Sequence, residues 1–165
     1  MTVQRLITTF FGVGLLRPAP GTWGSAAALP AGYFLHGIGG FALLAFATVA
    51  VFFVGWWATQ SETRGRENHD PSEIVIDEVA GQWIALWPLS AGLWMLGSDP
   101  WLFPYPGWVG AFVLFRLFDI WKPGPVGWAD RRHNALGVML DDVIAGIMAA
   151  AVVALAAAIA HGVFA

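Results

Sequence analysis

The chain has 165 residues, of which 58% are hydrophobic and only 12% charged, so it is far more apolar than an ordinary soluble domain. Its formal net charge of −3 offers no basic patch for the phosphates of a nucleic acid, which excludes DNA and RNA as partners. It contains no cysteine, which excludes a disulfide framework, a thiolate zinc site and an iron–sulfur cluster.

The N-terminal stretch from Met1 to Arg17 has one early arginine and an apolar middle, as a secretory signal peptide does. Pro18 and Pro20 follow it directly, and no pattern of small residues marks a cleavage site. We therefore expect this stretch to be retained and to lie at a membrane interface.

Five apolar segments follow, at about Ser25 to Leu35, Ile38 to Thr59, Ile74 to Leu96, Trp108 to Trp121 and Leu136 to Ala160. Clusters of helix-breaking residues separate them, such as the IGG that starts at Ile38 and the SDPWLFPYPG that contains Asp99. Inside lipid every backbone group must be hydrogen-bonded within its own segment, and period-two alternation is absent, so we expect helices. The sequence predicts one all-α domain over residues 1–165, a polytopic membrane bundle of about five segments. The first segment is shorter than the roughly 20 residues of a membrane helix, and it either crosses the membrane or is re-entrant, leaving on the side from which it entered.

Threaded back and forth through a membrane, these segments place almost every charge on one side. All eight Lys and Arg lie there, and Asp99 is the only one of the eleven acidic residues on the other side. The positive-inside rule makes the charged side cytoplasmic. If the first segment re-enters instead of crossing, the downstream topology inverts, but the charged clusters still share one face.

The loop RPAPGTWGS, from Arg17 to Ser25, combines prolines, a turn-forming PG and hydroxyl groups at the entry to the first apolar segment. Thr22 or Ser25 could cap that helix. Free backbone N–H groups at a helix start also attract phosphate oxygens. A simple cap and a phosphate-binding loop both stay open from this motif alone.

Two acidic pairs open later segments, Asp77 with Glu78 and Asp141 with Asp142. Apolar residues precede each pair, and small residues follow it, which allows a neighbouring helix to come close. Carboxylates within a membrane helix cost roughly 2.5 to 3.5 kcal/mol each at its centre, so acids gathered at one face need a common partner. Oxygen ligands of this kind suit Mg²⁺. The alternatives are favourable contact with the helix macrodipole for the first pair and capping by Asp141 for the second.

The motif FRLFDIWKP spaces Arg116, Asp119 and Lys122 by three residues, which places them on one helical face. Either the charges neutralise one another, or the second cation remains free for a phosphate oxygen. Pro123 then ends the helix. Of the loop histidines, we assign His69 to the substrate phosphate and give His133 no role.

Four motifs in this order, PGTWGS, IVIDEVAG, FRLFDIWKP and LDDVIAG, resemble the phosphatidylglycerophosphatase A family from about Gly12 to Ala150. The resemblance implies Mg²⁺-dependent hydrolysis of phosphatidylglycerophosphate to phosphatidylglycerol and inorganic phosphate, in bacterial glycerophospholipid synthesis. It also implies a multi-pass protein of the bacterial cytoplasmic (inner) membrane, whose partner is the phospholipid substrate in the bilayer and whose active site faces the cytoplasm.

The working hypothesis is a site that binds one or two Mg²⁺ and a substrate phosphate. The predicted metal ligands are Asp77, Glu78, Asp119, Asp141 and Asp142. Of these, Asp77, Glu78, Asp119 and Asp142 are assigned catalytic roles. The predicted phosphate-binding residues are Thr22, Ser25, His69, Arg116 and Lys122. A water activated by the metal is the favoured nucleophile. An aspartyl-phosphate intermediate is the alternative, although the DxDx[TV] pattern of haloacid-dehalogenase-like phosphatases is absent.

Other functions compete with this hypothesis. A cation-coupled transporter would also carry intramembrane acids, but it predicts them near mid-membrane on both halves of the bundle. A phosphatase acting on a related lipid phosphate would use the same site. A non-catalytic helical subunit of a lipid-synthesis complex would leave the acidic pairs unexplained. The oligomeric state and the number of metal ions stay open.

Overall fold

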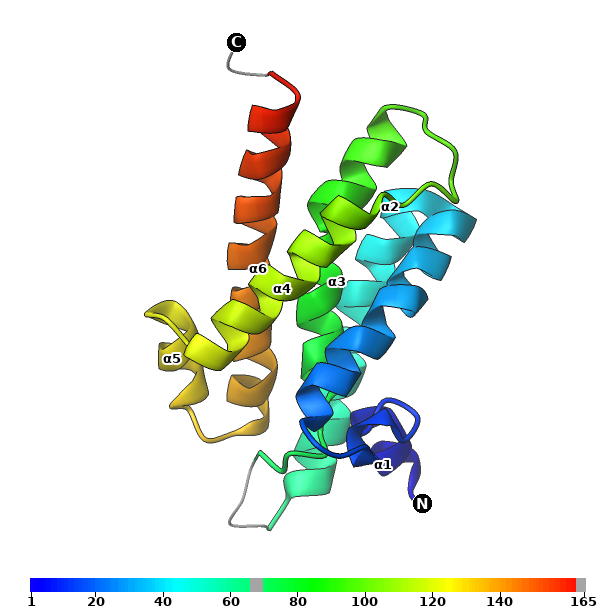
Figure 1. Cartoon of the computed structure of the whole chain (residues 1–165). Helices are drawn as coiled ribbons and strands as arrows, with labels where there is room; N and C mark the ends of the chain where they lie inside the picture. Colours follow the sequence, from blue (N-terminus) through cyan, green and yellow to red (C-terminus); the bar gives the residue numbers. More distant parts are fainter. Residues whose placement is uncertain (66–69, 163–165) are drawn as a thin grey trace.

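The computed structural model describes residues 1–65 and 70–162, which form helices and connecting loops and contain no β-strand (Figure 1). The elements in chain order are α1 (Val3–Thr8), the short 3₁₀ helix η1 (Val13–Leu15), α2 (Pro20–Thr63), α3 (Ile76–Met95), α4 (Tyr105–Trp121), α5 (Pro125–Asp130) and α6 (Ala135–Ala160). The all-α prediction is confirmed for these residues.

Helix α2 is a helical hairpin rather than one straight helix. Gly39 and Gly40 have non-helical backbone angles, and Gly40 has a φ of 61°, which glycine adopts without strain. Figure 1 shows the first arm running away from α1 and the second arm returning toward the end where it began. The predicted break at the IGG is therefore confirmed, and the first two apolar segments correspond to the two arms.

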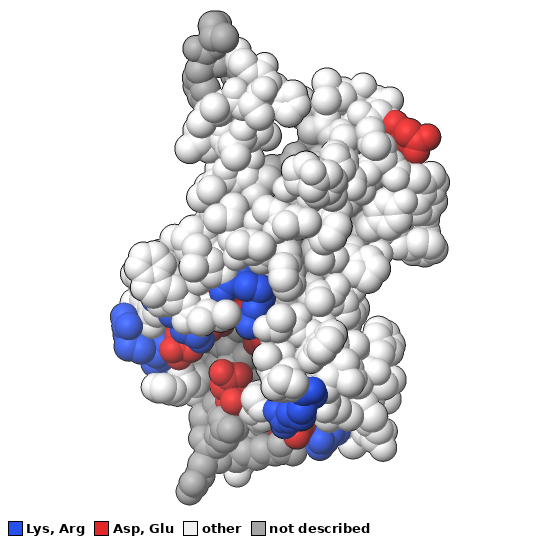
Figure 2. All heavy atoms as spheres, viewed as in Figure 1, with Lys and Arg blue, Asp and Glu red and all other residues white. Residues whose placement is uncertain are grey.

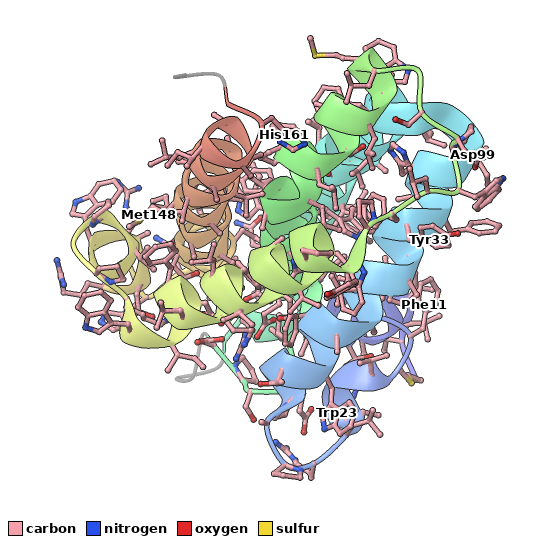
Figure 3. The ribbon with its side chains drawn as sticks, turned by 45° about the horizontal axis from the view of Figure 1, so that its top comes forward. Phe11, Trp23, Tyr33, Asp99, Met148 and His161 are labelled. Carbon is pink, nitrogen blue, oxygen red and sulfur yellow. The ribbon has the colours of Figure 1, made fainter. Side chains whose placement is uncertain are left out.

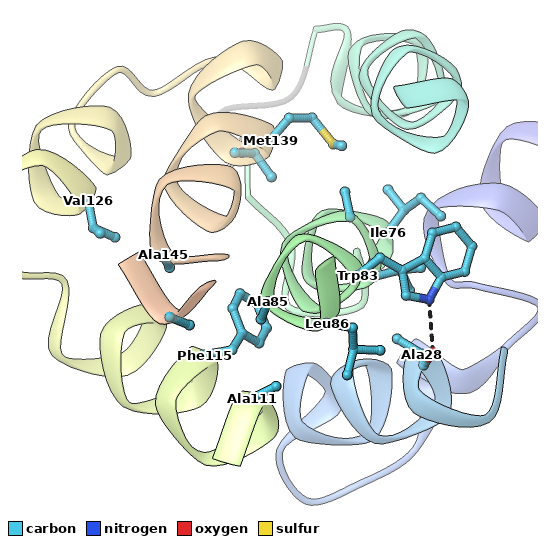
Figure 4. Close-up of a cluster of buried hydrophobic side chains, with 14 of the residues drawn as sticks. Ala28, Ile76, Trp83, Ala85, Leu86, Ala111, Phe115, Val126, Met139 and Ala145 are labelled. Atoms are coloured by element: carbon cyan, nitrogen blue, oxygen red, sulfur yellow. Dashed lines mark hydrogen bonds between the residues drawn. The ribbon is translucent and has the colours of Figure 1, made fainter. Parts of the chain in front are cut away.

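Helix α3 lies at the centre of the bundle and packs against α2 and α6 (Figure 4). Its buried apolar side chains join those of α4 and α6 in one core, and Trp83 Nε1 donates a hydrogen bond to the backbone oxygen of Ala28, 2.8 Å away. Gly81 and Gly146 allow α3 and α6 to touch, because a Cβ added to Gly146 would lie 2.4 Å from the Gly81 oxygen. This contact sets the spacing between the acidic pairs of the two helices.

The N-terminal stretch folds against the loop that precedes α3. The backbone N–H of Val75 donates to the Thr8 oxygen at 2.8 Å, and Arg5 forms an ion pair with Glu73, also at 2.8 Å. Helix α5, which was not predicted, packs against α6. Both pieces surround the end of the bundle at which α3 and α6 begin.

The charged side chains visible in Figure 2 gather at that same end, apart from one acidic group at the far end. Figure 3 labels Asp99 in the loop between α3 and α4, remote from Trp23 near the start of α2. The starts of α2, α3 and α6 and the end of α4 thus share the charged end.

Helices α2 and α6 are each long and apolar enough to cross a membrane, judged by length and composition alone. The outer surface also exposes many large apolar side chains, among them Phe46, Phe53 and Ile120. Helices α3 and α4 coincide with the predicted third and fourth apolar segments, but they are not among the helices that meet this criterion.

Candidate metal and phosphate site

A hollow of about 280 Å³ opens at the charged end of the bundle. The starts of α2, α3 and α6, the end of α4 and the loop before α3 all contribute to it. Its polar lining residues are Asp70, Ser72, Asp77, Glu78, Arg116, Asp119, Lys122, Asp141 and Asp142. All five predicted metal ligands therefore face one cavity. Larger pockets of about 410 and 440 Å³ lie elsewhere, and no carboxylate lines either of them.

Three of the five acids form a compact cluster. Asp77, Glu78 and Asp142 each offer a carboxylate oxygen, and these three oxygens lie within 4.8 Å of one another. Asp77 is 6% exposed and Asp142 is 3% exposed. Oxygens bound to one Mg²⁺ at about 2.1 Å lie at most about 4.2 Å apart, so a small contraction of the cluster would suit this ion.

Two oxygens of this cluster have no hydrogen-bond partner among the described residues, namely Glu78 Oε2 and Asp142 Oδ1. A buried carboxylate oxygen without a partner is costly, because it has lost its water and gained nothing in return. Together with the mutual repulsion of three carboxylates, this arrangement favours a bound cation.

Gly21 at the start of α2 makes room for the cluster. A Cβ at this position would lie 2.2 Å from Glu78 Oε1 and 3.3 Å from Arg116 Nη1. The PG turn of the first motif therefore brings the backbone of α2 against the carboxylate. This is a steric role that the sequence analysis did not assign.

Arg116 and Asp119 form an ion pair within the hollow, with both side chains about one-seventh exposed. The same guanidinium lies 4.0 Å from Glu78 Oε1 and donates to Ser25 Oγ at 3.4 Å. Asp119 is thus joined to a cation and lies outside the three-acid cluster, while Arg116 stands beside the cluster.

Lys122, the second cationic residue that lines the hollow, also contacts acidic side chains. Its ammonium donates to Asp141 at 2.8 Å and pairs closely with Asp130 of α5. Partial burial lowers the pKa of Lys122, but the hydrogen bonds to Asp130 and Asp141 outweigh it and raise the pKa above its ordinary value. Lys122 therefore remains charged, and Asp141 is bound to it rather than to the three-acid cluster.

The loop before α3 adds two polar residues that the sequence analysis missed. Asp70 and Ser72 line the hollow, and the Ser72 hydroxyl accepts a hydrogen bond from Arg17 at 3.2 Å. Asp70 is exposed as a residue, yet desolvation of its carboxyl raises the pKa of this group, against the opposing effect of Lys122. Their position directly before the first acidic pair was the available signal.

The capping interpretations are wrong. Helix α2 begins at Pro20 after Ala19, with no side-chain cap, so neither Thr22 nor Ser25 caps it. Neither Thr22 nor Ser25 is among the residues lining the hollow. Thr22 is half-buried, and Ser25 is fully buried and donates a hydrogen bond to the Gly21 oxygen at 2.8 Å.

The alternative in which Asp141 caps α6 is also wrong, because Asn134 caps that helix by accepting from the Gly137 N–H at 2.8 Å. Asp141 lies further along α6 and has no capping role. His69 lies outside the described residues. His133, which received no role, does not line the hollow.

Comparison with known proteins gives a consistent result over almost the whole chain. A family model described as Phosphatidylglycerophosphatase A matches residues 6–157. A Phosphatidylglycerophosphatase A from Haemophilus influenzae is 38% identical over 90% of this chain and 85% of its own length, and one from Escherichia coli is 34% identical over 89% and 79%. A protein from Bacteroides thetaiotaomicron, provisionally named phosphatidylinositol-3-phosphatase, is 36% identical over 92% and 91%. No solved structure matches the chain.

Proposed function

Because the chain belongs to the phosphatidylglycerophosphatase A family, we propose that it hydrolyses phosphatidylglycerophosphate to phosphatidylglycerol and inorganic phosphate in a Mg²⁺-dependent reaction. One observation carries the proposal for the site, namely the three carboxylates of α3 and α6 whose oxygens lie within 4.8 Å of one another. They stand in a hollow that also contains two cationic side chains suited to a phosphate.

The donor set fits Mg²⁺, which prefers carboxylate oxygens and keeps waters and phosphate oxygens in its remaining positions. Asp77, Glu78 and Asp142 would hold the ion, and the two unpartnered oxygens of Glu78 and Asp142 support this assignment. Asp119 and Asp141 line the same hollow and would complete the ligand set, or hold a second ion, when their cations turn to the substrate. When bound, Mg²⁺ supplies positive charge to the transferred phosphoryl group and lowers the pKa of a water ligand.

The two cationic side chains, Arg116 and Lys122, would bind the substrate phosphate. Charge spreads over the equatorial oxygens of the phosphoryl group in a loose transition state, and fixed cations stabilise it. Arg116 would donate from its guanidinium, and Lys122 from its ammonium at the end of α4. Water adds to phosphorus as the bond from phosphorus to the glycerol oxygen breaks, and the proton that the water gives up passes to that oxygen.

We place this site at the cytoplasmic face of a bacterial inner membrane. In this arrangement the two arms of α2, together with α3, α4 and α6, form the five predicted segments, and the charged end lies at the inner headgroups. The acyl chains stay in lipid beside the helices, while the phosphorylated headgroup enters the hollow.

The test is phosphate release from phosphatidylglycerophosphate in mixed micelles by the purified protein, with Mg²⁺ or with EDTA. We expect activity with Mg²⁺ that EDTA abolishes. Asp142→Asn should lose at least about 100-fold, since a metal contributes several kcal/mol to the transition state. Asp99→Asn at the opposite end of the bundle is the matched control and should match the wild type. Equal activity in EDTA and Mg²⁺ would refute the metal assignment.

A related lipid phosphate is the second candidate substrate, and the relative from Bacteroides thetaiotaomicron supports it. The same assay with phosphatidylinositol 3-phosphate decides between them, because a higher kcat/KM on that lipid would reassign the substrate. Cation transport is less well supported, because the acids that line the hollow share one end of the bundle rather than its middle.

A further inference from the structure

Gln82 is a fully buried glutamine whose amide oxygen and amide nitrogen both lack a hydrogen-bond partner among the described residues. Leaving such a group unpaired costs on the order of 1 to 3 kcal/mol, so each case calls for an explanation. Apolar residues of similar size, such as methionine, would fill the same space without this cost. The unpaired amide of Gln82 is therefore a candidate for a role that apolar packing does not provide.

The position of Gln82 on α3 indicates what it faces. It follows Glu78 by one helical turn, so the two side chains share a face of the helix. Glu78 points toward the start of α2 and toward Arg116. Leu86, one turn further along, meets Gly32 in the first arm of α2. From this spacing we place Gln82 next to Glu78 along α3, on the side of the helix toward the first arm of α2.

Two further buried atoms without partners belong to Glu78 and Arg116. Within residues 1–65 and 70–162, Glu78 Oε2 is an acceptor without a donor and Arg116 Nε is a donor without an acceptor. The Gln82 amide supplies the complement of each, because its nitrogen donates and its oxygen accepts. The amide of Gln82 therefore offers a donor of the kind that Glu78 Oε2 lacks and an acceptor of the kind that Arg116 Nε lacks.

We propose that Gln82 is a positioning residue that joins Glu78 to Arg116, directly or through one buried water. Its amide nitrogen donates to the Glu78 carboxylate, and its amide oxygen accepts from the Arg116 guanidinium that would bind the phosphate. A carboxylate oxygen has two lone pairs, so Glu78 Oε2 can accept this hydrogen bond and still bind the cation. The two halves of the site are then fixed relative to each other. This inference rests on the proposed function, since it assigns Gln82 to the same metal and phosphate site.

The inference predicts opposite effects on function and stability. Gln82→Met keeps the volume and removes the amide, so the thermal midpoint should stay the same or rise. Loss of a residue that orients a metal ligand typically reduces metal affinity or activity by about 10- to 100-fold. We expect kcat/KM to fall, and the Mg²⁺ concentration for half-maximal activity to rise, within this range.

Thr59→Val is the matched control. Among the described residues, Thr59 is also fully buried and its hydroxyl has no hydrogen-bond partner, but it lies on the second arm of α2 and does not line the hollow. It should leave kcat/KM and the Mg²⁺ requirement unchanged. A Gln82→Met protein with wild-type kcat/KM and Mg²⁺ requirement would overturn the inference. So would a loss of activity that merely follows a lower thermal midpoint.

If Gln82→Met does not yield folded protein, Gln82→Glu carries the test. This variant keeps an oxygen for Arg116 but sets a carboxylate against Glu78, so it should need more Mg²⁺ and regain activity when Mg²⁺ is raised. An unchanged Mg²⁺ requirement would contradict the inference. The wild type in the same assay separates the two claims, because its failure to release phosphate would refute the proposed function itself.

Discussion

The contact between α3 and α6 can be tested with one methyl group. In Gly146→Ala the new Cβ would lie 2.4 Å from the Gly81 oxygen, whereas an ordinary contact begins at 3.4 Å. The helices must therefore separate by about 1 Å, which moves Asp142 away from Asp77 and Glu78. A misplacement of about 1 Å costs on the order of 100-fold in rate, and overpacking costs about 1 to 3 kcal/mol of stability.

The assay measures phosphate release across a Mg²⁺ titration, together with thermal unfolding of the purified protein. We expect Gly146→Ala to lose about 100-fold in kcat/KM and to need more Mg²⁺. Gly92→Ala in the same helix as Gly81 is the control, because no atom lies within 4 Å of its added Cβ and alanine favours helices. Wild-type activity and Mg²⁺ dependence in Gly146→Ala would refute the argument that this contact sets the geometry of the acids.

Three further predictions address other parts of the hollow. Gly21→Ala should push the Glu78 carboxylate aside, since its Cβ would lie 2.2 Å from Oε1, and should lower kcat/KM by about 10- to 100-fold with a higher Mg²⁺ requirement in a metal titration. Lys122→Met removes a side chain that would bind the phosphate and leaves Asp141 without its cation, so it should raise KM for the lipid and lower kcat. Lys122→Arg keeps the positive charge and should retain more activity in the same steady-state assay. Inorganic phosphate should inhibit the enzyme, and calorimetry should detect its binding only when Mg²⁺ is present, because the acids that line the hollow outnumber its cations. Equally tight phosphate binding in EDTA would contradict the prediction that the metal binds first.

Hydropathy predicted the long helices well, because their apolar runs are bounded by charges and by breakers. Helix α3 lies within two residues of the predicted segment at each end, and α6 within one. The starts of α2 and α4 were placed too late in the chain. Pro20 and Pro106 lie in the first turns of these helices, where proline is tolerated, whereas the sequence predicted Pro20 in a loop and Pro106 in a helix-breaking cluster.

The sequence could indicate which acids share a face but not how they divide among partners. The i, i+3 spacing of Arg116 and Asp119 predicted their ion pair as one of two alternatives. Lys122 pairs with Asp141 and also with Asp130, which lies at the end of the unpredicted α5. Which acids meet depends on the approach of α3 to α6, and such a tertiary contact is not encoded in local periodicity.

Under the proposed function, the charge balance within the hollow predicts the order in which its ligands enter. The lining contains six carboxylates and two cations, and each cation already contacts acidic neighbours, so a phosphate arriving first would meet a negative site. A divalent cation entering first is attracted by the three-acid cluster and reduces its charge. Arg116 and Lys122 can then exchange a carboxylate for a phosphate oxygen at little electrostatic cost, since the metal compensates the acid that each one leaves. In the proposed mechanism, the two cationic side chains thus offset part of the negative charge of the acids before a metal binds, and they would bind the substrate phosphate afterwards.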